Sequence, residues 1–151
     1  MVTKAMIEDF ISQPSLAIVG VSRTKKEKFG NAAFKELNTK GYALSLVHPS
    51  GEIIEGQQSY PSLKALPSKV GGVLVVVPPQ QAEKVVREAH EAGIERVWLQ
   101  QGAESPTAIE YAQQNGMSVV YGHCILMFAR PMAFMHKPHR WVMQLLGKLP
   151  K

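Results

Sequence analysis

The residues best suited to binding chemistry follow a short apolar run near the N-terminus. Residues 16–19 read LAIV and Gly20 ends the run. Ser22 then offers a hydroxyl and a backbone N–H to a phosphate, and the segment 22–29, SRTKKEKF, contains four basic side chains. Gly30 and Asn31 then open a helical pattern. A glycine turn that leads into a helix offers unpaired N–H groups and a positive dipole end to an anion. This spacing favours a phosphate site; a solvated charged loop, or a tight turn without a ligand, is the alternative.

Four further apolar runs end in residues that suit a ligand-binding edge. The residues that follow these runs are small, amide, imidazole, thiol or proline residues without a carboxylate, namely His48 and Pro49, Pro78 and Pro79, residues 100–102, and residues 122–124. In an open parallel sheet, ligands bind beside the carboxyl ends of the strands. Because no pair of carboxylates meets at these ends, general acid–base catalysis is not predicted. No catalytic or metal-ligating residue is predicted either.

The elements that must position these residues alternate between strands and helices. Strands are predicted over residues 16–19, 42–47, 72–77, 94–99 and 118–121, and helices over residues 4–11, 30–40, 82–92 and 105–115. Within the irregular stretch 50–69, Ile53 and Ile54 are expected to form a short edge element and residues 62–66 a helical turn. This alternation is typical of βαβ units with right-handed crossovers. It predicts an α/β, Rossmann-like three-layer fold with a mainly parallel five-stranded sheet and a C-terminal helical tail.

Composition narrows the class of protein. The chain of 151 residues fits one domain, for which roughly 100–200 residues is usual. Its single cysteine excludes an internal disulfide framework and a CxxC zinc site, and is typical of a reducing compartment. No run reaches the roughly 18 apolar residues of a membrane span, and the first residues, MVTKAMIEDF, carry acids where a signal peptide has an apolar run. We therefore expect a cytoplasmic protein without a transmembrane segment.

The ordered segments of the chain resemble a known family. In sequence order the chain contains GVSRTKKEKFGNAAFKEL, GYALSLVHPSGEIIEGQQSYPSLKALP, GVLVVVPP, GIERVWLQQGAES and GHC. Together, over residues 14–124, they resemble the small stand-alone CoA-binding proteins, which are similar to the N-terminal CoA-binding domain of the succinyl-CoA synthetase alpha subunit. The resemblance implies a Rossmann-like fold that holds coenzyme A across the carboxyl edge of its sheet.

The resemblance also implies a role for each strand end. The phosphates of coenzyme A are expected beside Gly20, Val21, Ser22 and Arg23, with Lys28, Phe29 and Gly30 close by. The adenosine part would be bordered by His48 and Pro49, and the pantetheine path would be lined by Val77, Pro78 and Pro79. The thiol end is expected near Gln100 and Gly102. The synthetase relatives carry a lysine after the second strand, where this chain has Ser50 and Gly51, so the basic loop is the expected source of that charge.

A non-catalytic domain that binds coenzyme A or an acyl-CoA as a sensor, carrier or regulator is the leading interpretation. Ligase activity by this chain alone is not expected, because the relatives' phosphohistidine domain and grasp partner are absent from it. One alternative is an NAD(P)-binding oxidoreductase or redox sensor. The chain lacks the G-x-G-x-x-G motif and the acid after the second strand that such a site normally has, and both absences count against this alternative. Another is the CoA-site subunit of a multichain acyl-CoA ligase.

Charge and apolar residues set the end of the chain apart from its body. Residues 1–122 hold 12 basic and 12 acidic side chains, whereas residues 123–151 hold five basic and no acidic ones. The neutral body argues against a nucleic-acid partner. We expect a CoA-binding domain over residues 1–124 and a basic, Met-rich helical extension over residues 125–151. Residues 139–149, HRWVMQLLGKL, have one apolar helical face. This face predicts packing on the domain or on a partner subunit, as in a homodimer. The alternative is contact with a membrane surface or an acidic partner.

The single cysteine, Cys124, follows the fifth predicted strand at the ligand edge of the sheet. An inert buried thiol is one interpretation. The other is that Cys124 forms a mixed disulfide with coenzyme A, which would show as an added mass after treatment with oxidised coenzyme A.

Overall fold

The structure, a computed structural model, describes residues 1–25 and 27–132. Its helices are α1 (Lys4–Ile11), α2 (Phe29–Thr39), α3 (Pro79–Glu91) and α4 (Pro106–Gln114), with short 3₁₀ turns η1 (Leu63–Ala65) and η2 (Ile125–Met127). Its strands are β1 (Ser15–Val19), β2 (Ala43–Val47), β3 (Ile53–Ile54), β4 (Gln57–Tyr60), β5 (Gly72–Val75), β6 (Arg96–Leu99) and β7 (Ser118–Val120). All five predicted strands and all four predicted helices are confirmed.

The sheet has the strand order β3-β4-β2-β1-β5-β6-β7. Every pairing is parallel except that of β3 with β4. The predicted count of five strands is therefore wrong: the described part of the chain forms seven. The two additional strands form a hairpin whose turn residues, Glu55 and Gly56, both have positive φ, at 52° and 75°. Two such residues match the two-residue turns that suit hairpin twist, and β4 then pairs with β2 despite its polar sequence.

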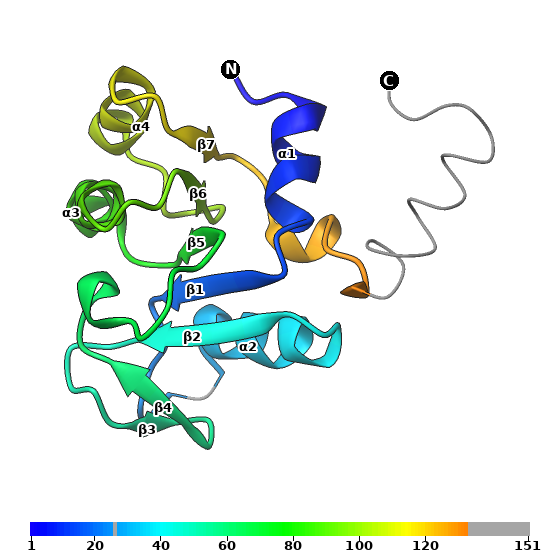
Figure 1. Cartoon of the computed structure of the whole chain (residues 1–151), viewed down its shortest axis with the longest axis vertical. Helices are drawn as coiled ribbons and strands as arrows, with labels where there is room; N and C mark the ends of the chain where they lie inside the picture. The colour runs from blue at the N-terminus through cyan, green and yellow to red at the C-terminus, as the bar shows by residue number, and fades with distance from the viewer. Residues whose placement is uncertain (26, 133–151) are drawn as a thin grey trace.

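Helices cover both faces of the sheet and form the three predicted layers. Figure 1 shows α3 and α4 on one face, and α1, α2 and η2 on the other. Each face has its own buried apolar cluster, as expected for parallel strands that are covered on both sides. The Rossmann-like fold class predicted from the alternation of elements is confirmed.

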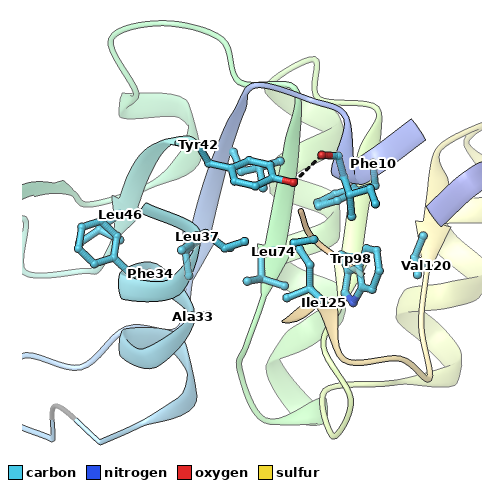
Figure 2. Close-up of a cluster of buried hydrophobic side chains, with 14 of the residues drawn as sticks. Phe10, Ala33, Phe34, Leu37, Tyr42, Leu46, Leu74, Trp98, Val120 and Ile125 are labelled. Carbon is cyan, nitrogen blue, oxygen red and sulfur yellow. Dashed lines mark hydrogen bonds between the residues drawn. The ribbon is translucent and has the colours of Figure 1, made fainter. Parts of the chain in front are cut away.

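The cluster on the α1 and α2 face centres on aromatic packing (Figure 2). The ring of Phe10 meets that of Trp98 edge-on, with 5.4 Å between their centroids. The Trp98 indole donates a hydrogen bond to the His123 carbonyl at 3.0 Å, so its polar atom is satisfied inside the core. The Tyr42 hydroxyl donates to the Ile11 carbonyl, and burial raises the pKa of this phenol well above its ordinary value. These contacts attach α1 and the loop after β7 to the sheet.

The chain beyond β7 returns to the same cluster. Ile125, Ala129 and Met132 are buried in it, and the Met132 N–H donates to the Lys40 carbonyl at 2.8 Å. The expected domain boundary after residue 124 stays a prediction. The apolar helical face predicted for residues 139–149 lies outside the described residues. Among the residues that the structure describes, no helix is both long and apolar enough to cross a membrane.

Strand order reverses between β1 and β5, and the backbone at this point is tightly packed. The chain leaves β1 toward β2 on one side, while β5 lies on the other. Gly20 has φ +125°, and a Cβ atom there would lie 2.2 Å from the Val76 carbonyl oxygen. A Cβ atom on Gly30 would lie 2.6 Å from the Gly20 carbonyl oxygen. Glycine at both positions lets the end of β1 touch β5 and the start of α2.

This packing predicts a strong effect of a single methyl group. We expect Gly20→Ala to lower the free energy of unfolding by at least ~2 kcal/mol, because positive φ and overpacking against a carbonyl act together. Gly102→Ala is the matched control: Gly102 has φ +100° but no atom within 4 Å of an added Cβ. Gly102→Ala should lower the free energy of unfolding by about 1–2 kcal/mol, because it introduces backbone strain without overpacking. Urea unfolding measures both, and equal losses would contradict the packing argument.

Candidate functional site

Two adjoining cavities lie at the carboxyl ends of the central strands. The larger, of about 540 Å³, is lined by the ends of β1, β2 and β5 together with Pro61 and the side of α3. The smaller, of about 300 Å³, is lined by the start of α2, the residues after β5 and the turn after β6. Both include Gly20, Lys28, Val76, Val77 and Pro78. The cavities therefore meet at the point where strand order reverses, as in other open α/β sheets.

All predicted site residues except Arg23 and Pro79 line one of the two cavities. The larger cavity takes in Gly20, Val21, Ser22, Lys28, His48, Pro49, Val77 and Pro78. The smaller takes in Gly20, Lys28, Val77 and Pro78 again, together with Phe29, Gly30, Gln100 and Gly102. The topology thus brings together residues that are up to 82 positions apart in the chain, from Gly20 to Gly102. Their contacts with a ligand remain predictions.

Arg23 and Pro79 line neither cavity. The Arg23 guanidinium forms an ion pair with Glu52 at 3.0 Å, with both side chains about half exposed. Pro79 is the first residue of α3 and is exposed to solvent. In the described structure the charge of Arg23 is therefore balanced by a carboxylate on the loop after β2, a partner that the sequence analysis did not identify.

The two helices that border the cavities begin without a capping side chain. In α1 and α4, hydroxyl oxygens accept from first-turn N–H groups: Thr3 from Met6 at 3.1 Å and Ser105 from Ala108 at 3.3 Å. The residues at the equivalent positions of α2 and α3, Lys28 and Pro78, form no such side-chain bond. Helix α2 also begins at Phe29, one residue before the predicted Gly30. The start of α2 thus leaves first-turn N–H groups for an anion, whereas in α3 Pro79 has no N–H group and the Gln81 N–H donates to the Pro78 carbonyl at 2.9 Å. Both helix starts still bring the positive end of a helix dipole to the cavity border.

The backbone N–H of Ser22 is bonded within the protein, whereas the sequence predicted it to be free for a phosphate. Its backbone N–H, expected to serve a phosphate, donates to the Asn31 Oδ1 atom at 2.8 Å. Its hydroxyl oxygen accepts from the N–H groups of Thr24 at 3.3 Å and Lys25 at 2.9 Å. The hydroxyl acts as an acceptor in both bonds and keeps its own proton for donation. The hydroxyl of Ser22, rather than its amide, is therefore the group with a free donor at this cavity.

His48 is a polar but uncharged part of the wall. Its Nδ1 atom accepts from the Ser50 N–H at 3.1 Å, which places the proton of the neutral ring on Nε2. Burial lowers the pKa of His48, the nearby Arg23 charge lowers it further, and Glu52 acts in the opposite direction. The ring is therefore neutral near pH 7 and contributes a face and one donor rather than a charge.

Three polar residues of α3 line the larger cavity and were missed by the sequence analysis. Gln81, Lys84 and Glu88 share one helix face, because their spacings of three and four residues match the helical period. The apolar face of α3, through Ala82 and Val86, points into the core. The helical spacing of these three residues already indicated one polar face, but only the packing of α3 beside β5 shows that this face meets the strand ends. Glu88 also brings a carboxylate to a cavity whose strand-end residues have none.

The turn after β6 is held by two side chains. The Gln100 amide oxygen accepts from the Ile125 N–H at 3.1 Å, so this predicted site residue also anchors η2. The Glu104 carboxylate accepts from the N–H groups of Gly102 at 2.8 Å and Gly122 at 3.1 Å. Cys124, which follows β7, is half-buried, forms no disulfide and lines neither cavity. Its mixed disulfide with coenzyme A remains a hypothesis.

Comparison with known proteins defines the class. A family model described as a CoA-binding domain matches residues 14–130, so the chain belongs to this family. A solved structure of a conserved hypothetical protein from Pyrococcus furiosus is 36% identical, with a TM-score of 0.70 over 75% of this chain and 97% of that one. A hypothetical protein from Pyrococcus horikoshii is 27% identical, with a TM-score of 0.73 over 91% of this chain and 92% of that one.

A larger enzyme subunit is also similar. The alpha subunit of acetate–CoA ligase (ADP-forming) II from Pyrococcus furiosus is 27% identical in an alignment 133 residues long that covers 80% of this chain. The aligned region is 28% of the length of that subunit. The resemblance to CoA-binding domains of the succinyl-CoA synthetase type is thereby confirmed.

The environment of His48 predicts a measurable titration. We expect the His48 ring protons to titrate in NMR spectra with a pKa below 6.5. Arg23→Gln should raise this pKa, because a repelling charge is removed, and Glu52→Gln should lower it further. Since folding lowers the pKa, the contribution of His48 to stability is present above pH 6.5 and is lost as the pH falls through the folded value. A pKa above 6.5 in the native chain would contradict the assignment.

Proposed function

We propose that this chain binds coenzyme A or an acyl-CoA in the two adjoining cavities and acts as a non-catalytic sensor, carrier or regulatory domain. One observation carries the proposal: the N-termini of α2 and α3, neither of them capped by a side chain, border the same two cavities, which Lys28 also lines. Two helix dipoles and an ammonium group favour a strongly anionic ligand. Membership of the CoA-binding domain family supports a ligand with both phosphates and a long neutral arm.

The two cavities suit the parts of such a ligand. Gly20, the Ser22 hydroxyl and Lys28 would hold phosphate oxygens beside the start of α2. The larger cavity, with His48, Pro49 and Pro61, offers flat and apolar surfaces for the adenosine part. Val77 and Pro78 lie in both cavities and would line the pantetheine path toward Gln100 and Gly102. Arg23 would join the site only by leaving Glu52.

A second function has one observation in its favour. The chain matches part of an acetate–CoA ligase alpha subunit, so it would supply only the CoA site of a multichain ligase. Such a role requires a partner that binds the nucleotide. Copurification with a nucleotide-binding protein, and acyl-CoA formation by the pair but not by this chain, would favour this function over a stand-alone sensor or carrier.

Ligand preference tests the proposed function directly. We expect coenzyme A to raise the melting temperature of the chain more than dephospho-CoA or NAD does. A ligand at 100 times its dissociation constant stabilises a protein by about 2.7 kcal/mol, which a thermal-shift series detects readily. The absence of any shift with millimolar coenzyme A would reject the proposal, and a larger shift with NAD would favour the oxidoreductase alternative.

The role of Lys28 can be tested with a matched lysine. We expect Lys28→Ala to weaken coenzyme A binding by at least about tenfold, because a charge-assisted hydrogen bond to phosphate contributes about 1.5–3 kcal/mol. Its melting temperature should stay close to that of the native chain, because the Lys28 side chain does not cap α2. Lys4→Ala serves as the control, since Lys4 is an exposed lysine on α1 and lines neither cavity. Calorimetric titration measures the coenzyme A affinity of both variants, and equal affinities would place the phosphates away from Lys28.

A further inference from the structure

Asn31 is a fully buried polar residue in the first turn of α2, and it bonds to a different segment of the chain. Its Oδ1 atom accepts from the Ser22 N–H at 2.8 Å, and its Nδ2 atom donates to the Ser22 carbonyl at 2.9 Å. Both main-chain polar groups of one loop residue are thereby paired with the two ends of one amide. The pairing works only while the amide keeps one orientation, because its two ends have opposite hydrogen-bonding character.

Glu55 sets that orientation. Its Oε2 atom accepts from the Asn31 Nδ2 at 2.9 Å, and only the NH₂ end of an amide can donate to a carboxylate. Only 9% of the Glu55 side chain is exposed, and Lys35 lies 3.8 Å from its other oxygen. A flipped amide would turn an oxygen toward this carboxylate and an NH₂ group toward the Ser22 N–H. The carboxylate therefore holds the Asn31 oxygen against the Ser22 amide.

The backbone at Glu55 is also unusual. Among the described residues, Glu55 is the one non-glycine residue with positive φ, at 52°. It stands in the turn of the β3–β4 hairpin, where glycine or asparagine would adopt this conformation with less strain. This backbone conformation directs a glutamate, rather than a glycine or asparagine, from the hairpin turn to Asn31 on α2.

We propose that Asn31 and Glu55 are positioning residues that shape the loop after β1 before a ligand arrives; we call the pair the Asn31–Glu55 clamp. The inference rests on the proposed function, since the loop it shapes carries Val21 and Ser22 into the larger cavity. Neither Asn31 nor Glu55 lines a cavity. The clamp thus links phosphate affinity to a hairpin at the edge of the sheet.

The direction in which coenzyme A affinity changes when the Glu55 carboxylate is removed distinguishes the clamp from a simple charge effect. Removal of a carboxylate near an anion site should strengthen anion binding if charge alone matters. The clamp predicts the opposite for Glu55→Ala: coenzyme A should bind about tenfold more weakly, the loss expected for one charge-assisted hydrogen bond. Glu52→Ala is the control, because Glu52 pairs with Arg23 and has no hydrogen bond to Asn31. It should leave the affinity unchanged or raise it.

Variants that keep a hydrogen bond between positions 31 and 55 should retain or recover coenzyme A affinity. Glu55→Gln keeps an oxygen that accepts from Asn31, so its affinity should remain within about threefold of the native value, as for a hydrogen bond that has lost only its charge. Asn31→Asp removes the NH₂ donor, faces Glu55 with a like charge and should bind weakly. Combining Asn31→Asp with Glu55→Gln replaces that repulsion with an amide-to-carboxylate bond and should recover part of the loss.

A measurement without ligand distinguishes failure of the clamp from failure of the proposed function. Hydrogen exchange by NMR should show a protected Ser22 amide in the native chain and in Glu55→Gln, and faster exchange in Glu55→Ala. If coenzyme A fails to bind but Ser22 responds in this way, the clamp stands and the proposed function falls. An unprotected Ser22 amide in the native chain, or equal or tighter coenzyme A binding by Glu55→Ala, would overturn the clamp.

Discussion

Backbone-to-backbone contact at the end of β1 is the constraint on which the rest of the site depends. Side-chain atoms are excluded from Gly20 by the Val76 carbonyl and from Gly30 by the Gly20 carbonyl. With no Cβ atom at either position, the end of β1 lies against β5, and α2 can begin directly beside both. The two cavities share their walls at this place because the same few residues form the reversal of strand order. A bulkier residue would separate the helix start from the strand end and divide the site.

The charges around the cavities are more balanced than the basic segment 22–29 suggests. Arg23 is paired with Glu52, His48 is neutral near pH 7, and Glu88 lines the same cavity as Lys84. Among the described residues, Lys28 forms no ion pair, and it lines both cavities at the start of α2. Oriented backbone groups at the two helix starts, whose directions the fold fixes, therefore contribute to the positive field at these cavities together with the Lys28 charge.

The β3–β4 hairpin connects the edge of the sheet to its centre. It adds a parallel strand beside β2, and its turn carries Glu55 to the helix that follows β1. The loop before it carries Glu52 to Arg23 and Ser50 to His48. The irregular stretch between β2 and β5 therefore supplies no wall of its own apart from Pro61 and the residues next to β2, yet it orients several groups near the cavities. In this family member, the loop after β1 and the hairpin act as one structural unit.

The sequence by itself determined the order of the five buried strands and the four helices, the parallel character of the sheet and the family, whereas ligand binding at the carboxyl edge stays a prediction. Runs such as residues 16–19 and 72–77 report burial on both faces, and glycine or proline marks where each run stops. Only the tertiary structure decided that the polar residues of β4 pair with β2, that Glu52 neutralises Arg23, and that the Ser22 amide belongs to Asn31. It also decided which face of α3 meets the cavity. The reason is physical: local patterns record backbone preference and burial, whereas the partner of a polar group depends on which distant segments the folded chain brings within hydrogen-bond distance.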